Sequence, residues 1–235
     1  MVLACGQDVG DLRRMRPACI VPAMFDLCDA LRGRFIVFDG PDGSGKTTQF
    51  HRFAEACRAH TLDVCEVREP GGTHIGEQIR NILLDPGNED MSLRCEMMLY
   101  MASRAQLIEQ MIRPALERGE LVLADRFISS TLAYQGTAGG MSQEEILAVG
   151  RVAIGNIWPE LTVVFDVDSS TAARRLNPLL DRMEQKGEAF HARVRQGYLA
   201  QAQATPDEYL VIDASPCEDD VSAALITGLK ARLGV

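Results

Sequence analysis

The segment that most constrains this chain is the run Gly40-Pro41-Asp42-Gly43-Ser44-Gly45-Lys46-Thr47, which follows the apolar stretch RFIVFD at 34–39. Its spacing is GxxxxGK[ST], and it lies between an expected buried strand and an expected helix, as this motif requires. Glycines at these positions let the backbone wrap around phosphate groups with its N–H groups pointing inward, and the helix N-terminus adds positive potential. The sequence therefore predicts a phosphate-binding loop (P-loop) for a nucleoside triphosphate. Its predicted residues are Gly40, Pro41, Asp42, Gly43, Ser44, Gly45, Lys46, Thr47 and Thr48.

Two side chains of this loop are expected to act on the phosphates directly. Lys46 should bridge the β- and γ-phosphates, and the Thr47 hydroxyl should complete the shell of a Mg²⁺ ion. Asp125 ends the apolar run ELVLAD, so we expect its carboxylate at the carboxyl edge of the sheet, where it suits the outer shell of the metal. Arg126 follows it and suits bidentate contact with a phosphate, the alternative being a plain salt bridge at the strand end.

Short apolar runs alternate with segments of helical period from residue 34 onward. Several runs are almost wholly apolar, as strands buried on both faces should be. This alternation predicts an α/β fold of the P-loop NTPase type: a five-stranded parallel sheet with helices on both faces, forming one domain over 34–235. The expected strands are 34–39, 63–68, 120–125, 161–168 and 208–213, and the expected helices lie near 46–60, 75–84, 92–118, 142–155, 169–176, 186–204 and 217–233.

Residues 1–33 precede the first expected strand. They lack a positively charged start followed by an apolar stretch of the length that export signals need. We expect a poorly ordered extension, with a functional arm as the alternative.

The composition limits the partners of the chain. A net charge of −9 and a pI near 5 argue against binding of DNA or RNA polymers, which depends on a basic surface. No apolar run reaches the roughly 20 residues that a membrane-spanning helix needs. The seven cysteines show no metal-ligand spacing, which is typical of reduced thiols in the cytoplasm.

The P-loop by itself allows GTPases, ATPases and kinases. The chain has no NKxD string, which a guanine-specific switch would need. A carboxylate that faced the triphosphate would be repelled, so Asp42 should point outward, toward a neutral hydroxyl or the water shell of the metal. A sugar hydroxyl on an acceptor is its natural partner.

Five motifs in order carry a family resemblance: DGPDGSGKTT, REPGGTHIGEQIR at 68–80, YMASR at 100–104, DRFISSTLAYQG at 125–136 and LDRME at 180–184. Together they make the chain resemble bacterial thymidylate kinases, which pass the γ-phosphoryl group of ATP to dTMP. The resemblance covers about residues 34–235. It implies that Asp42 approaches the 3′-hydroxyl of the acceptor sugar and that Arg126 binds the acceptor phosphate.

The resemblance also implies where the acceptor binds. Glu69 and Arg80 become candidate contacts of the loop after the second strand. Tyr100 and Arg104, four residues apart on one helix face, suit stacking on a pyrimidine and donation to its carbonyl oxygen. Thr131 and Gln135 are implied near the N3 edge of the base, with Tyr134 under the sugar. Each also has an ordinary structural interpretation, as a turn, a core residue or a helix end.

Phosphoryl transfer further needs cations around the moving group. The position after Asp42 is Gly43, so the loop itself carries no such arginine. The resemblance points to a short lid around 176–184 with Arg182, Arg174 and Arg175, in this order of expectation. For each, a solvated helix face is the alternative.

The sequence thus predicts an ATP- and Mg²⁺-dependent dTMP kinase, cytoplasmic and, as in the family, a homodimer, with the Met-rich helix near residue 97 as its apolar surface. Two alternatives stay open at this point. One is another P-loop kinase acting on a nucleoside or a different monophosphate, since thymine and uracil differ by one methyl group. The other is a nucleotide-binding regulator without turnover.

Overall fold

The computed structural model describes residues 21–175 and 182–235. Its centre is a five-stranded sheet in the order β2-β3-β1-β4-β5, in which all neighbouring strands are parallel. The strands are β1 (Phe35–Asp39), β2 (Val64–Arg68), β3 (Leu121–Asp125), β4 (Leu161–Asp166) and β5 (Tyr209–Asp213). The expected α/β fold is confirmed.

Helices fill the connections between the strands. The α-helices are α1 (Val21–Leu31), α2 (Lys46–Ala59), α3 (His74–Leu84), α4 (Leu93–Leu107), α5 (Arg113–Glu117), α6 (Ile128–Thr131), α7 (Gln143–Ile154), α8 (Ser169–Arg175), α9 (Glu188–Ala204) and α10 (Glu218–Leu233). Two π-helical segments, η3 (Ile108–Ile112) and η4 (Leu132–Ala138), continue α4 and α6, and η2 (Pro86–Asn88) and η5 (Glu184–Lys186) are short 3-10 turns.

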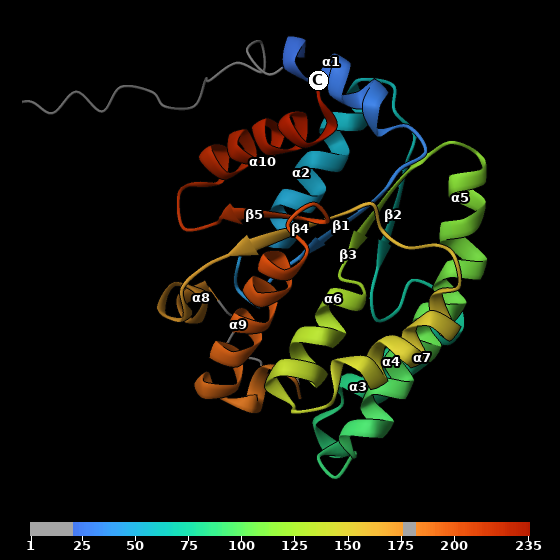
Figure 1. Ribbon diagram of the computed structural model, residues 1–235, viewed down its shortest axis with the longest axis vertical. Helices are drawn as coiled ribbons and strands as arrows, with labels where there is room; N and C mark the ends of the chain where they lie inside the picture. Colours follow the sequence, from blue (N-terminus) through green and yellow to red (C-terminus); the bar gives the residue numbers. More distant parts are fainter. Residues whose placement is uncertain (1–20, 176–181) are drawn as a thin grey trace, which may run out of the picture.

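Alternate residues of each central strand enter different cores. Ile36 and Phe38 of β1 pack with α1, α2 and α10, whereas Phe35 and Val37 pack with α4, η3 and α7. A third cluster joins α9 to η4 and β4. Figure 1 shows the sheet between these helical layers. Because helices cover both faces of the central strands, β1, β3 and β4 are buried and mostly apolar, which makes them easy to locate in the sequence. Each strand lies within one or two residues of its expected limits.

The N-terminal boundary requires a correction. Helix α1 lies inside the stretch expected to be a poorly ordered extension, yet it packs against α2 and α10 (Figure 1). Met24, Leu27, Cys28 and Leu31 are buried in the same core as β1. Their spacing of three and four residues places them on one helix face. The packed unit therefore includes α1, and residues 1–20 lie outside the described part.

The carboxyl edge of the sheet is where the predicted site residues should meet, because all strands run in one direction. Each strand ends in an acidic residue or is followed directly by one: Asp39, Glu69, Asp125, Asp166 and Asp213. Within the described ranges, none of the helices combines the length and the apolar character needed to cross a bilayer.

Candidate functional site

The P-loop connects β1 to α2 with backbone conformations that only glycine adopts readily. Gly40 has φ 141° and Gly43 has φ 75°. A Cβ atom on Gly40 would lie 2.5 Å from the carbonyl oxygen of Phe165, and one on Gly43 would collide with the carbonyl oxygen of Ala172. The loop is therefore pressed against β4 and α8, and neither glycine can carry a side chain.

A cavity of about 700 Å³ opens over this loop. It is lined by 41–49, by Arg126 and Arg175, and by residues at the start of α10. Ser44 points a buried hydroxyl oxygen into the P-loop region that has no hydrogen-bond partner among the described residues. An orphaned donor inside a glycine-lined cradle at a helix N-terminus fits a phosphate group. We call this cavity the donor cavity.

Lys46 and Thr47 extend from the first turn of α2 toward the end of β3. The Lys46 ammonium pairs with the Asp125 carboxylate, and the Thr47 hydroxyl donates to Asp125 Oδ2 over 3.4 Å. Burial works to raise the pKa of Asp125, but the charges of Lys46 and Arg126 outweigh it and hold this pKa below its usual range. The carboxylate and the hydroxyl oxygen are hard donors, as Mg²⁺ prefers. The structure thus brings these three predicted site residues together.

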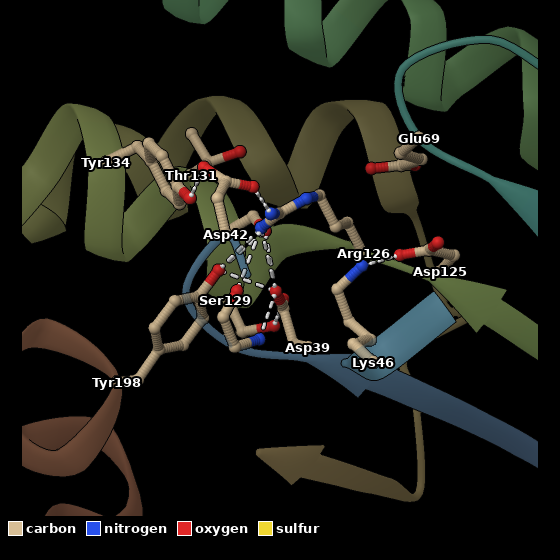
Figure 2. A network of polar contacts seen from close by, with 12 residues as sticks. Asp39, Asp42, Lys46, Glu69, Asp125, Arg126, Ser129, Thr131, Tyr134 and Tyr198 are labelled. Carbon is tan, nitrogen blue, oxygen red and sulfur yellow. Dashed lines mark hydrogen bonds and ion pairs between the residues drawn. The ribbon is translucent and has the colours of Figure 1, made fainter. Parts of the chain in front are cut away.

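Arg126 occupies the junction between β3 and α6. Its Nη2 pairs with Asp42, and its guanidinium lies 5.3 Å from the centre of the Tyr134 ring. The Tyr134 hydroxyl donates to the other oxygen of Asp42 over 2.6 Å. Burial alone would raise the pKa of Asp42, but Arg126 and Tyr134 outweigh it, so this pKa lies below its ordinary value. Figure 2 shows the three side chains meeting.

Asp39, the last residue of β1, anchors a network that the sequence did not reveal. Its carboxylate accepts hydrogen bonds from the hydroxyls of Ser129 (2.5 Å), Ser130 (2.7 Å) and Tyr198 (2.6 Å). Arg126 Nη1 reaches the Tyr198 and Ser130 hydroxyls over 3.1 Å each (Figure 2). These hydrogen bonds therefore hold the guanidinium of Arg126 in place on the side of Asp39. No local pattern marks it, since Tyr198 comes from α9.

A second, smaller pocket lies beyond Asp42, on the side of α4 and η4. Most of the residues predicted for the acceptor line it: Asp42, Arg80, Tyr100, Arg126, Thr131, Tyr134 and Gln135. They come from the P-loop, from α3 and α4, and from the segment that runs from the end of β3 through α6 and η4. We call this space the acceptor pocket.

Two predicted acceptor contacts lie outside that lining. Glu69 and Arg104 form a buried ion pair, with Arg104 Nη2 2.6 Å from Glu69 Oε2. Arg104 also donates to Thr131 Oγ1 over 3.2 Å, so it reaches the pocket wall through Thr131. Burial raises the pKa of Glu69 to about 7, against the opposing charge of Arg104. The pair therefore lies behind the pocket lining, which it contacts through Thr131.

The three arginines expected to serve the lid separate in the structure. Arg175 lines the donor cavity and donates to the carbonyl oxygens of Ala214 and Ser215. Arg174 donates to Ser170 and Thr171 of its own helix.

Arg182 is only 7% exposed and pairs with the buried Glu96 over 2.6 Å. It lines neither the donor cavity nor the acceptor pocket. This placement corrects the expected order, in which Arg182 came first. The central part of the predicted lid, 176–181, lies outside the described residues.

Comparison with known proteins agrees with this geometry. Residues 38–225 match the family model described as thymidylate kinase. A thymidylate kinase of Desulforapulum autotrophicum is 43% identical over 210 residues, covering 86% of this chain and 92% of that protein. One of Deinococcus radiodurans is 45% identical over 205 residues, covering 86% of this chain and 98% of that protein.

A solved structure shares the fold. The crystal structure of thymidylate kinase from Ehrlichia chaffeensis superposes with a TM-score of 0.71 at 31% identity, covering 85% of this chain and 99% of that one. The matches extend over nearly the whole length of these relatives, and the range of the family match, 38–225, contains the P-loop and the residues that line the acceptor pocket. The chain therefore belongs to the thymidylate kinase family.

Proposed function

We infer that this protein transfers the γ-phosphoryl group of ATP to dTMP and so forms dTDP. The observation that carries this inference is the shared wall between the two spaces: Asp42 and Arg126 line both the donor cavity and the acceptor pocket. Phosphoryl transfer needs the donor and acceptor phosphates end to end, with cations around the moving group. A guanidinium in the shared wall supplies charge at the point where the two phosphates meet.

The chain's own residues act by position and charge. Lys46 neutralises the β- and γ-phosphates, and Arg126 holds the acceptor phosphate in a fork of two N–H donors. Three arginines were predicted to serve the lid. We assign Arg175 to the donor phosphates, because it is the one of these three that lines the donor cavity. No protein nucleophile is required for a direct transfer between phosphates.

We further propose that Mg²⁺ accompanies ATP. Thr47 would bind the ion through its hydroxyl, and Asp125 would hold it through the water shell. When bound, the ion neutralises charge that builds up on the phosphate oxygens. Lys46 then exchanges part of its pairing with Asp125 for the phosphates.

The acceptor nucleotide is proposed to lie with its sugar against Asp42 and Tyr134 and with its base toward Thr131 and Gln135. The Tyr134 ring and the Asp42 carboxylate are joined by a hydrogen bond, so they form one rigid wall for the sugar. Tyr100 is half-buried on α4 and lines the same pocket, where its ring can stack on a pyrimidine.

The test is a coupled assay of ADP formation with dTMP, dUMP, dCMP and thymidine. We expect turnover that depends on dTMP and stops when Mg²⁺ is removed with a chelator. Faster phosphorylation of thymidine than of dTMP would assign the protein to the nucleoside kinases instead. Purified protein that forms no ADP with any acceptor would be a nucleotide-binding regulator.

We also propose a homodimer in the cytoplasm, with the unit from α1 onward as the catalytic domain. Met97 and Met101 of α4 face the core, but Met98 of α4 and Val152 of α7 are exposed on two helices that pack together. The described cysteines are free thiols, as the cytoplasm maintains them.

A further inference from the structure

A buried charge near the acceptor pocket belongs to Glu96, a residue of α4 that the proposed mechanism does not use. Its side chain is 1% exposed. Buried carboxylates need partners, and Glu96 has three. Arg182 Nη2 lies 2.6 Å from Oε2, Lys186 Nζ lies 3.4 Å from the same atom, and Gln135 Nε2 donates to Oε1 over 2.7 Å.

These contacts fix which way the Gln135 amide faces. The Glu96 carboxylate oxygens lie opposite N–H groups of Arg182, Lys186 and Gln135, so they act as acceptors in all three contacts. Gln135 must therefore present its NH₂ group to Glu96. Its carbonyl oxygen, Oε1, is the remaining amide atom, and Gln135 lines the acceptor pocket. Within the described part of the chain, no hydrogen bond of this amide uses Oε1.

A hydrogen-bond acceptor of the protein at the edge of the base discriminates between pyrimidines. Thymine and uracil carry N3–H, a donor, whereas cytosine carries an unprotonated N3, an acceptor. A carbonyl oxygen pairs with the first and faces a lone pair of the second. A site built around such a hydrogen bond rejects the analogue that lacks it by about 10⁴-fold or more.

We propose that Glu96 sets the base selectivity of this protein as a positioning residue: it holds Gln135 with Oε1 toward the acceptor base, so that the pocket selects a pyrimidine with N3–H. Arg182 and Lys186 support this role because their ion pairs hold the Glu96 carboxylate in place. The inference deepens the proposed function and rests on it, because it takes a pyrimidine monophosphate as the acceptor.

The position of Arg182 has a second anchor. Its Nε donates to the carbonyl oxygen of Leu83 over 2.7 Å, and its backbone N–H donates to that of Leu84. Arg182 thus ties the end of α3 to Glu96 on α4. This assigns it to the support of the acceptor pocket.

The experiment compares kcat/KM for dTMP and for dCMP in the wild type and in Glu96→Gln. The variant keeps the size of the side chain but can donate as well as accept, so Gln135 can turn over. We expect the dTMP to dCMP ratio to fall at least about 10-fold, through a loss with dTMP and a gain with dCMP, while the KM for ATP stays unchanged. Glu109→Gln, which neutralises an exposed carboxylate paired with Arg113, is the matched control and should leave the ratio unchanged.

A double-mutant cycle sharpens the result. Gln135→Leu removes the amide, and in that background Glu96→Gln should not change the ratio further. Should Glu96→Gln fail to fold, Glu96→Asp keeps the charge but withdraws it from Gln135, and we expect a smaller drop of roughly two- to fivefold in the ratio.

The possible outcomes test the role of Glu96 separately from the proposed kinase function. Equal losses with dTMP and dCMP in Glu96→Gln, or a wild-type ratio near one, overturn the role of Glu96 while leaving a kinase in place. A wild type that phosphorylates neither nucleotide overturns the proposed function itself, and the role of Glu96 with it.

Discussion

Two aspartates end neighbouring parallel strands and have opposite surroundings. Asp39 closes β1 and Asp125 closes β3, and the register pairs Asp125 with Phe38, the residue before Asp39. Asp39 is fully buried and takes hydrogen bonds from three hydroxyls, whereas the Asp125 side chain is 13% exposed and pairs with Lys46 and Thr47 beside the donor cavity. Under the proposed function, a bound phosphate would compete with Asp125 for Lys46, so Asp125 can exchange its contacts. Asp39 cannot, so it belongs to the scaffold.

The largest expected effect comes from removing Lys46, which pairs with Asp125 and is proposed to bind the phosphates of ATP. We expect Lys46→Met to lower kcat by about 10³-fold, with little change in dTMP binding. The reason is that the variant loses the positive charge that neutralises the transferred phosphoryl group. Steady-state kinetics and calorimetric titration of dTMP measure the two quantities. Equal losses of turnover and dTMP affinity would contradict the role given to Lys46.

Asp125→Asn is the next test. We expect kcat to fall by roughly 10- to 100-fold and the Mg²⁺ concentration for half-maximal rate to rise, because an outer-shell ligand loses its charge. The free energy of unfolding should change little. Metal titrations followed by activity and denaturant unfolding check both points, and an unchanged Mg²⁺ requirement would exclude Asp125 from the metal site.

Asp39→Asn should have the opposite pattern of effects, with a larger loss of stability and an unchanged Mg²⁺ requirement. The variant loses acceptors for buried hydroxyls, so we expect a loss of about 1–3 kcal/mol in the free energy of unfolding. Turnover should fall only about tenfold, through the displacement of Arg126, and the Mg²⁺ requirement should stay the same. If Asp39→Asn raises the Mg²⁺ requirement as Asp125→Asn is expected to do, then Asp39 is not a purely structural residue and the contrast between the two aspartates is wrong.

The smallest effect concerns the carboxylate after β2. Burial raises the pKa of Glu69 to about 7 from its ordinary 4.5. A carboxyl with a raised folded-state pKa binds a proton more readily in the folded than in the unfolded protein. Its stabilising contribution is therefore full below about pH 4.5 and is lost as the pH rises through 7.

Glu69→Gln should accordingly flatten the decline of the unfolding free energy between pH 4.5 and 7. Denaturant unfolding of wild type and variant across this range measures the two slopes. Parallel curves would mean that Arg104 keeps Glu69 ionised throughout.

The parts of the fold set by local pattern could be predicted from the sequence. Strands buried on both faces are apolar runs, and the P-loop is a contiguous motif, so both were found with their limits nearly correct. Helix α1 was missed, although Met24, Leu27 and Leu31 carry its apolar spacing, because the stretch precedes the first motif. The π-helical segment η4 has no sequence signal that we know.

The site could be predicted only where family motifs mark it. The networks of Asp39 and Glu96 join residues that lie far apart in the chain, as Tyr198 lies 159 positions after Asp39. Hydrogen bonds between a tyrosine and a buried aspartate leave no periodicity in the sequence. For the same reason Arg182 was expected beside the phosphates, whereas Glu96 holds it elsewhere.

Arg126 adopts a left-handed backbone conformation with φ 72°, which costs a non-glycine residue roughly 1 kcal/mol or more. Glycine would adopt it without that penalty, but would bring no positive charge to the junction of donor and acceptor. It would also remove the ion pair with Asp42 and the hydrogen bonds to Ser130 and Tyr198, and so leave buried polar groups without their partner. Heat resistance and turnover are therefore expected to fall together in Arg126→Gly, and libraries screened for either property should retain the arginine.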